Sequence, residues 1–394
     1  MKKRLLLTIA LSTLGFGTFA QDVNIPDANL KAYLVGNSAI NTNGDAEIQV
    51  SEATAFTGDI FANNLGITDL TGIEAFINVD GLYVRGNSLG TIDVSANVAM
   101  TYLDCRNTGI STLDLSSNIA LEGIDCMLNN LTSLDLSNNP NIGAIHCSDN
   151  DLTSLDVSNN LLLSNFSCDN NDLTSIDVSN NTALVYFVCH FNDLSSIDVS
   201  NCTDLSWFSC AGNNLTSLDV SNNLALGNLY CGVNNISLLD LGANTALQVL
   251  NCTVNDLSIL NVANGNNVNF SLFAASDNPN LTCIQVDDAT WSTTNWTSID
   301  PASSFSLDCN YPLAVNEVDL VQDLSIYPNP SSSILTIVLE NEVNSISIIG
   351  SMGNEIQASL SSSNTIDVSE LANGVYILQV ETERGIIREK FIKD

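Results

Sequence analysis

The sequence predicts a repeat solenoid, a right-handed coil with parallel β ladders, flanked by a small helical N-terminal cap and a C-terminal antiparallel β-sandwich. Three observations predict it. The string LTSLDVSNN at 152–160 returns with few changes every 21 residues, the period stops near residue 310, and short alternating apolar segments follow. A fixed period of this length indicates turns stacked into one elongated body rather than separate globular domains.

Residues 1–20 read as an export signal peptide. Lys2, Lys3 and Arg4 precede an apolar run that begins at Leu5, and small residues end the segment. No later apolar run is long enough to span a bilayer, so no transmembrane segment is expected. We therefore expect a mature protein that is soluble and lies outside the cytoplasm.

The chain is strongly acidic, with a formal net charge of −34 at pH 7. Between residues 32 and 383 the only Lys or Arg residues are Arg85 and Arg106. Phosphate backbones and anionic head groups would be repelled by such a surface, so nucleic acid and membrane-surface partners are not expected. Cations, basic proteins and neutral glycans stay open as partners.

Residues 21–60 are expected to form the helical N-terminal cap. The segment IPDANLKAYLV at 25–35 reads as a short amphipathic helix, and NTNGDAEIQVSE at 41–52 imitates an EF-hand calcium loop, with Ala46 in place of the usual Gly. Calcium is thus a candidate cofactor. The alternative is a plain helix-turn-helix that covers the apolar end of the first repeat. The candidate ligands are Asn41, Asn43, Asp45, Glu47 and Glu52.

Identical residues recur in columns 21 apart through residues 61–310. The cysteine column is Cys105, Cys126, Cys147, Cys168, Cys189, Cys210, Cys231 and Cys252. The aspartate column is Asp93, Asp114, Asp135, Asp156, Asp177, Asp198, Asp219 and Asp240. An asparagine follows three residues after most of these cysteines, so that each turn reads LxxLxCxxNxLxxLDLSxN.

This pattern resembles the leucine-rich repeat family in its 21-residue nested form. The resemblance covers residues 61–310 and implies a solenoid of about nine or ten turns, whose aliphatic residues build one continuous core. Within the turns, Leu and Val are expected to face inward and Asn to pair with the backbone at the corners.

The cysteine column could bind metal or form disulfides, or it could be an apolar stack. Parallel thiols on rungs about 4.8 Å apart offer neither disulfide geometry nor a tetrahedral metal cage, so a dry apolar stack is expected. Cys283 and Cys309 lie beyond the column, and a disulfide between them would close the end of the solenoid. Cys202 replaces a corner Asn and receives no role.

The LDLS half of each turn is uniform. Ser or Thr flanks nearly every Asp of the aspartate column, as Ser133 and Ser137 flank Asp135. Because stacked carboxylates repel one another, hydroxyl donors beside them indicate a hydrogen-bonded structural rung. The alternative is divalent cation binding along the column.

The other half varies at three outward positions, which we call the first, second and third columns: three residues before, one before and one after each Cys. In leucine-rich repeats these positions line the exposed strand face. Aromatic and small residues gather there over three turns and suit a binding hot spot or a sugar-stacking platform. The alternative is scattered surface aromatics. The predicted ligand-binding residues are Tyr186, Val188, His190, Trp207 and Tyr230.

Residues 311–322 look like a linker, and residues 323–394 are no longer periodic. This tail resembles the C-terminal sorting domain of the bacterial type IX secretion system, through Tyr327-Pro328-Asn329-Pro330, Gly374-Val375-Tyr376 and the closing Lys-Phe-Ile-Lys. The resemblance implies export across a Gram-negative outer membrane with the secretion machinery as a partner, and then release or surface attachment. A structural or carbohydrate-binding sandwich is the alternative.

Together these features favour a secreted or cell-surface binding or adhesion protein that recognises a protein or glycan ligand on its varied strand face. The first alternative is a structural surface or biofilm protein organised by calcium. A hydrolase is the other. We expect no enzyme, because the two histidines are far apart in the repeat and no Ser or Cys nucleophile stands beside a base.

Overall fold

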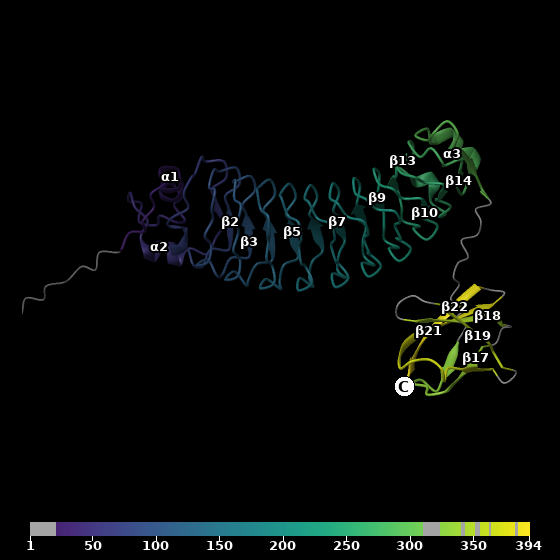
Figure 1. Ribbon diagram of the computed structural model, residues 1–394. Helices are drawn as coiled ribbons and strands as arrows, with labels where there is room; N and C mark the ends of the chain where they lie inside the picture. The colour runs from purple at the N-terminus through teal and green to yellow at the C-terminus, as the bar shows by residue number, and fades with distance from the viewer. Residues whose placement is uncertain (1–20, 310–323, 340–342, 351–354, 362–363, 383–384) are drawn as a thin grey trace, which may run out of the picture. The chain divides into compact units, whose positions relative to one another are not determined.

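The computed structural model describes residues 21–309, 324–339, 343–350, 355–361, 364–382 and 385–394. The expected signal peptide and linker lie outside these residues. The chain divides into two compact units, with the boundary between Cys309 and Asn310. Figure 1 shows the first unit as a coil of stacked turns and the second as a small β domain.

Two short helices precede the coil, α1 (Ala28–Gly36) and α2 (Val50–Ala55). Asp27 caps α1, because its Oδ1 accepts hydrogen bonds from the backbone N–H groups of Asn29 and Leu30. Its other oxygen, Oδ2, accepts from the backbone N–H and the hydroxyl of Thr68, in the first turn. A single carboxylate therefore starts the helix and holds it against the coil.

Short strands stack in parallel to form the main sheet. Its 11 strands are β1 (Ile60–Phe61), β2 (Gly81–Tyr83), β3 (Tyr102–Asp104), β4 (Gly123–Asp125), β5 (Ala144–His146), β6 (Asn165–Ser167), β7 (Tyr186–Val188), β8 (Trp207–Ser209), β9 (Asn228–Tyr230), β11 (Val249–Asn251) and β13 (Leu272–Ala274). From β3 to β11 the residue paired with any strand residue lies 21 positions on, for example Tyr186 with Trp207. The sequence period is therefore the register of the sheet.

The core runs continuously along the coil. The middle residue of each strand is buried, and so is the cysteine that follows the strand, because side chains alternate between the two faces. Between strands the corner asparagines satisfy backbone groups. The side-chain amide of Asn171 donates to the carbonyls of Cys147 and Cys168, and its oxygen accepts from the N–H of Leu152. Each such residue thus binds its own turn to the previous one.

The last turns carry a second parallel sheet on the LDLS half. It comprises β10 (Leu238–Asp240), β12 (Ile259–Asn261), β14 (Cys283–Gln285) and β15 (Ser304–Ser306). The helix α3 (Ala289–Asn295) and the ring of Trp296, which stacks on Phe273 at 4.0 Å between centroids, close this end. Two 3₁₀ turns, Ile73–Ala75 and Asn267–Asn269, lie in connections.

The second unit is an antiparallel sandwich. One sheet contains β16 (Ser325–Tyr327), β17 (Ile334–Val338) and β20 (Thr365–Asp367), and the other contains β18 (Val343–Gly350), β19 (Glu355–Ala358), β21 (Gly374–Thr382) and β22 (Gly385–Lys393). Leu335, Ile348 and Phe391 belong to one buried cluster shared by both sheets. The predicted fold class, a solenoid with parallel ladders followed by an antiparallel sandwich, is confirmed.

Candidate functional site: the varied strand face

A column of rings inside the coil sets the spacing of the outward residues. Phe166, Phe187 and Phe208 are the middle residues of β6, β7 and β8, and each is fully buried. Their ring centroids are 5.2 and 5.5 Å apart along the stack. Because the strands pair in register, the outward residues of successive turns lie beside one another on the face above.

Three predicted residues form one continuous aromatic stack on that face. The centroids of Tyr186 and Trp207 are 5.8 Å apart, with an angle of 27° between the ring planes. Those of Trp207 and Tyr230 are 5.5 Å apart at 32°. All three side chains are partly exposed. The indole of Trp207 thus lies between two phenol rings, and we call this set the aromatic stack.

The other two predicted residues differ from each other in exposure. His190 is partly exposed, and its ring lies 3.3 Å from a carboxylate oxygen of Asp169 and 3.4 Å from the hydroxyl of Ser209. Val188 lies in the second column but is only 5 % exposed. Sequence position placed Val188 on the outer face, whereas the packed neighbours leave it almost no surface to offer a ligand.

A second aromatic stack at the N-terminal end of the face was missed in the sequence. Phe61 and Tyr83 have centroids 4.6 Å apart, and Tyr83 and Tyr102 have centroids 5.4 Å apart. The ring of Tyr102 lies over Gly123 of the next turn, where a Cβ would be only 2.7 Å from it. The sequence did contain a signal for this stack. Val84 occupies the cysteine column in its turn, so Tyr83, one residue before it, lies in the second outward column.

Charged residues gather between the two stacks. Asp104 and Asp125 are 3 % exposed, and the guanidinium of Arg106 contacts both carboxylates, at 2.7 and 3.0 Å. The ring of His146 lies 3.6 Å from the same Asp125 oxygen that Arg106 contacts. The hydrogen bond to Asp125 is the main cause that raises the pKa of His146. One of the two solenoid arginines is therefore committed to buried carboxylates.

Charge divides the strand face into two halves. From β3 to β6 the three outward columns contain Asp104, Arg106, Asp125 and Asp169. From β7 to β13 the same columns contain no Asp, Glu, Lys or Arg. In a chain with a net charge of −34, this uncharged stretch is a local exception. Interface centres are typically depleted in charge and enriched in aromatic residues, and the half from β7 to β13 has that composition.

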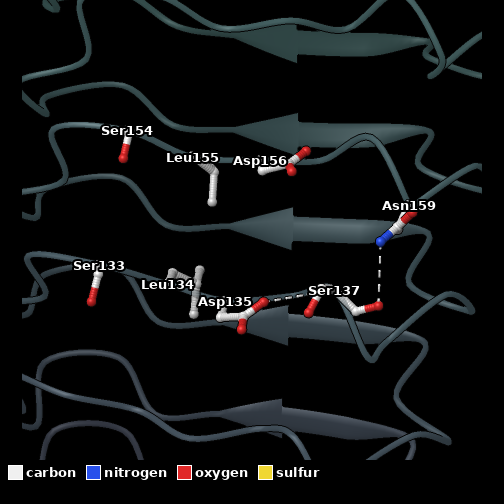
Figure 2. Close-up of a pocket in the computed structure, with 8 residues that line it drawn as sticks. All are labelled: Ser133, Leu134, Asp135, Ser137, Ser154, Leu155, Asp156 and Asn159. Atoms are coloured by element: carbon white, nitrogen blue, oxygen red, sulfur yellow. Dashed lines mark hydrogen bonds between the residues drawn. The ribbon is translucent and has the colours of Figure 1, made fainter.

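The LDLS half forms a different surface. Figure 2 shows a shallow hollow between two successive turns, in which Asp135 Oδ1 accepts a hydrogen bond from the backbone N–H of Ser137 at 2.9 Å. Hydrogen bonds from the backbone and the hydroxyl of Ser137 lower the pKa of Asp135. The bond stays within one turn, so it braces the corner locally. The hollow is lined by Ser133, Leu134, Asp135, Ser137, Ser154, Leu155, Asp156 and Asn159.

Cation binding along the aspartate column stays a prediction. Within the described part of the chain, no group of three or more His, Cys, Asp and Glu side chains lies close enough together to hold a metal ion. The carboxylates of the column are exposed and follow one another at the spacing of the turns.

The calcium-like loop is bonded internally. Glu52 Oε1 accepts from the N–H of Thr42 and of Asn43, and Glu52 Oε2 accepts from the N–H of Gln49. Asn41 donates to the carbonyl of Asp45, and Glu47 pairs with Lys31 at 2.6 Å. These contacts hold together the turn between α1 and α2. Calcium binding by Asn41, Asn43, Asp45, Glu47 and Glu52 stays a prediction.

The cysteines fall into two sets. Cys283 and Cys309 form a disulfide, the pair expected from the sequence, with an S–S distance of 2.01 Å. The eight residues of the cysteine column are free and fully buried. Burial raises the pKa of their thiols, to about 12 for Cys126 and Cys231. Cys202 is also buried, and its Sγ lies 3.7 Å from the carbonyl oxygen of Asn181 in the previous turn. In the next turn Asn223 makes the equivalent contact, with its amide nitrogen 2.8 Å from the carbonyl oxygen of Cys202.

Comparisons with known proteins agree with this architecture. Residues 325–394 match the family described as the secretion system C-terminal sorting domain. The functional domain of InlJ from Listeria monocytogenes, which includes a cysteine ladder, is similar in structure, with a TM-score of 0.55 and 22 % identity over 95 % of this chain and 99 % of that chain. An internalin (inlF) from Listeria monocytogenes has a TM-score of 0.61 and 19 % identity over 74 % of this chain and 94 % of that chain.

No curated protein sequence matches the chain. Within the described residues, no helix combines the length and apolar character that crossing a bilayer requires. The structural likenesses bear on the fold, and the sorting domain bears on export.

Proposed function

We propose that this chain, a leucine-rich repeat protein that ends in a type IX secretion sorting domain, is a secreted or surface-attached binding protein of a Gram-negative bacterium. Its varied strand face recognises a protein or a glycan, and adhesion to another surface is the role that such recognition serves. Its mechanism is rigid presentation, since the solenoid holds side chains at a fixed spacing without needing any movement on binding.

The observation that carries the proposal is the contrast between the two halves of each turn. The LDLS half repeats the same side chains from turn to turn, whereas the outward columns change at nearly every turn and bring Tyr186, Trp207 and Tyr230 into one stack. Stability does not require this variation, because the core lies on the opposite side of the strands. Partly exposed aromatic rings of this kind dominate the binding energy of many interfaces.

An array experiment tests the proposal. The full chain is applied to arrayed glycans and surface proteins, with and without calcium, and Trp207→Ala and Tyr186→Ala are compared with wild type. Leu224→Ala is the matched control, because Leu224 is 59 % exposed but lies outside the strand columns. We expect both aromatic variants to lose the bound targets while they keep the circular dichroism spectrum and Tm of a folded protein. Unchanged binding by both variants would refute the site.

A further inference from the structure

One corner position has the same unusual backbone conformation in almost every turn. The residue two positions after each cysteine has a positive φ, between 50° and 63° from Asn107 to Val254, which is the left-handed region. Asn, Asp and Gly tolerate this region, whereas bulky and β-branched residues are strained in it. The members of this left-handed column are Asn107, Leu128, Asp149, Asn170, Phe191, Gly212, Val233 and Val254.

The stack of turns imposes this conformation. The N–H of Val233 donates to the carbonyl of Thr253 at 2.8 Å, and the N–H of Val254 donates to the carbonyl of Ser276 at 3.1 Å. Equivalent bonds are made at Asn170 and at Gly212, which has no side chain, so the bond does not depend on the side chain at this position. Any residue at the position must therefore adopt the left-handed region, and apolar residues do so at a cost in stability.

That cost is not offset by burial in the core. Phe191 is 57 % exposed, Val233 49 % and Val254 45 %. The ring of Phe191 lies edge-on to His190 with 5.2 Å between ring centroids, and it covers Gly212, whose added Cβ would clash with it. Strained residues that contribute little to the core are expected at functional positions rather than at structural ones.

Three of the four apolar residues in the left-handed column lie beside the uncharged half of the strand face, and the fourth, Leu128, lies in the charged half. Phe191, Val233 and Val254 each directly follow the third-column residue of the turns that contain β7, β9 and β11. Between them and the aromatic stack lie His190 and small residues such as Ser209, Ala211 and Gly232. We call Phe191, Val233 and Val254 the apolar rail. The rail and the aromatic stack thus border one uncharged strip.

From this geometry we propose that the apolar rail is the second half of the binding surface, and that its occupant is a protein with an apolar contact patch bordered by Lys or Arg. The inference rests on the proposed function and narrows it from two ligand classes to one. The binding surface is short, because turns about 4.8 Å apart make the four turns from β7 to β11 extend only about 14 Å along the coil.

Ring geometry argues against a sugar. A sugar stacks on an open ring face, but the faces of Trp207 are covered by Tyr186 on one side and Tyr230 on the other. The indole of Trp207 therefore presents mainly its edge to solvent. The two valines of the rail, Val233 and Val254, would also desolvate sugar hydroxyls without offering them a hydrogen bond, whereas apolar side chains of a protein gain from the same contact.

Charge complementarity sets the rest of the partner's chemistry. Exposed Asp193 and Asp256 lie two residues beyond Phe191 and Val254, on the far side of the rail from the strand face. Asp169 borders the strip at the other end, where the charged half begins. A partner with basic residues around an apolar centre meets the exposed carboxylates of Asp193 and Asp256 and is attracted by the net charge of −34.

The test uses two defined probes on the full chain: a phage-displayed library of random linear and disulfide-constrained peptides, and an array of neutral oligosaccharides. The double variant Val233→Asn/Val254→Asn removes the two valines of the rail and keeps Phe191, and Asn is already the residue of this column at positions 107 and 170. Its Tm is expected to be no lower than that of wild type, so lost binding cannot be ascribed to unfolding. Leu224→Asn is the control, because Leu224 is an aliphatic residue on a different corner that is somewhat more exposed than either valine.

We expect wild type to enrich peptides that combine apolar residues with Lys or Arg. Their affinity should fall at least about tenfold in the rail variant and in Trp207→Ala, and stay unchanged in Leu224→Asn. If the rail variant bound these peptides with the same affinity as wild type, the inference would be overturned. Binding of neutral oligosaccharides that is lost in Trp207→Ala but kept in the rail variant would also overturn it, although the proposed function would then stand. If wild type retained neither probe, both proposals would fail.

Discussion

The indole of Trp207 lies against the phenol ring of Tyr186, with 5.8 Å between the ring centroids and 27° between the ring planes. The two residues are paired neighbours on β7 and β8, so the contact follows from the parallel register of the sheet. It means that one predicted binding residue positions another, and that the two should be energetically coupled even without a ligand.

A double-mutant cycle measures that coupling. Tyr186→Leu, Trp207→Leu and the double variant are unfolded in urea, and we expect an interaction free energy of about 0.5–1.5 kcal/mol. The control cycle pairs Tyr186 with Trp291, which lies in α3 at the C-terminal end of the coil and packs on Trp296 instead. Coupling indistinguishable from the control would show that the two rings do not support each other.

The left-handed column predicts substitutions that stabilise the protein. Val233→Asn and Val254→Asn should each raise the free energy of unfolding by about 1 kcal/mol, because Asn adopts a positive φ with less strain than Val. The reverse change, Asn170→Val, should lower it by a similar amount. Thermal and urea unfolding of the three variants provide the measurement. A destabilised Val233→Asn would mean that the strain is compensated by packing.

The two asparagine columns predict unequal losses. Asn171 donates to three carbonyls and accepts from the N–H of Leu152, whereas Asn181 donates to two carbonyls and its Oδ1 has no partner among the described residues. Since each buried group left unpaired costs about 1–3 kcal/mol, Asn171→Ala should destabilise by roughly 3 kcal/mol or more and Asn181→Ala by clearly less. Urea unfolding of the two variants measures the difference. Equal losses of stability would contradict the unequal hydrogen bonding of Asn171 and Asn181.

The cysteine column should be chemically silent in the folded protein. Nine cysteines are free and buried, and burial raises the pKa of the eight column thiols above the ordinary value. Because only an accessible thiolate reacts, Ellman's reagent at pH 8 should label none of them until denaturant is added, when all nine should react. Mass spectrometry of the labelled peptides identifies each site. Labelling of column thiols before denaturant is added would show that they face solvent.

His146 predicts a dependence of stability on pH. Its pKa is raised in the folded state, chiefly by the hydrogen bond to Asp125, so its contribution is complete below the unfolded-state value of about 6.5 and disappears as pH rises through the folded-state pKa. His146→Gln should therefore destabilise more at pH 6 than at pH 8. NMR titration of the wild-type imidazole should show a pKa above 6.5 that falls in Asp125→Asn. An unchanged value in that variant would assign the shift to another group.

The calcium-like loop has its own test. If Asp45 and Glu52 bind calcium, a chelator should lower the Tm of the full chain, and Asp45→Asn should abolish that effect. If the hydrogen bonds of Glu52 to Thr42, Asn43 and Gln49 hold the turn alone, the Tm should be indifferent to the chelator.

The sequence by itself determined the fold of both units. A period of 21 residues with apolar residues at fixed places can bury them only if successive turns stack in register. Residues 21 apart, such as Cys168 and Cys189, therefore occupy equivalent positions in successive turns. The same reasoning placed Trp207 and Tyr230 on the outer face, and the short alternating segments of the tail indicated antiparallel strands.

Only the tertiary structure decided how outward residues meet. Val188 belongs to an outward column yet is buried, and Arg106 bridges Asp104 and Asp125 of different turns, because long side chains reach across rungs in directions that a sequence position does not specify. The conformation at Val233 was equally hidden. Its own preference opposes a positive φ, and the hydrogen bond to Thr253 of the following turn overrides that preference.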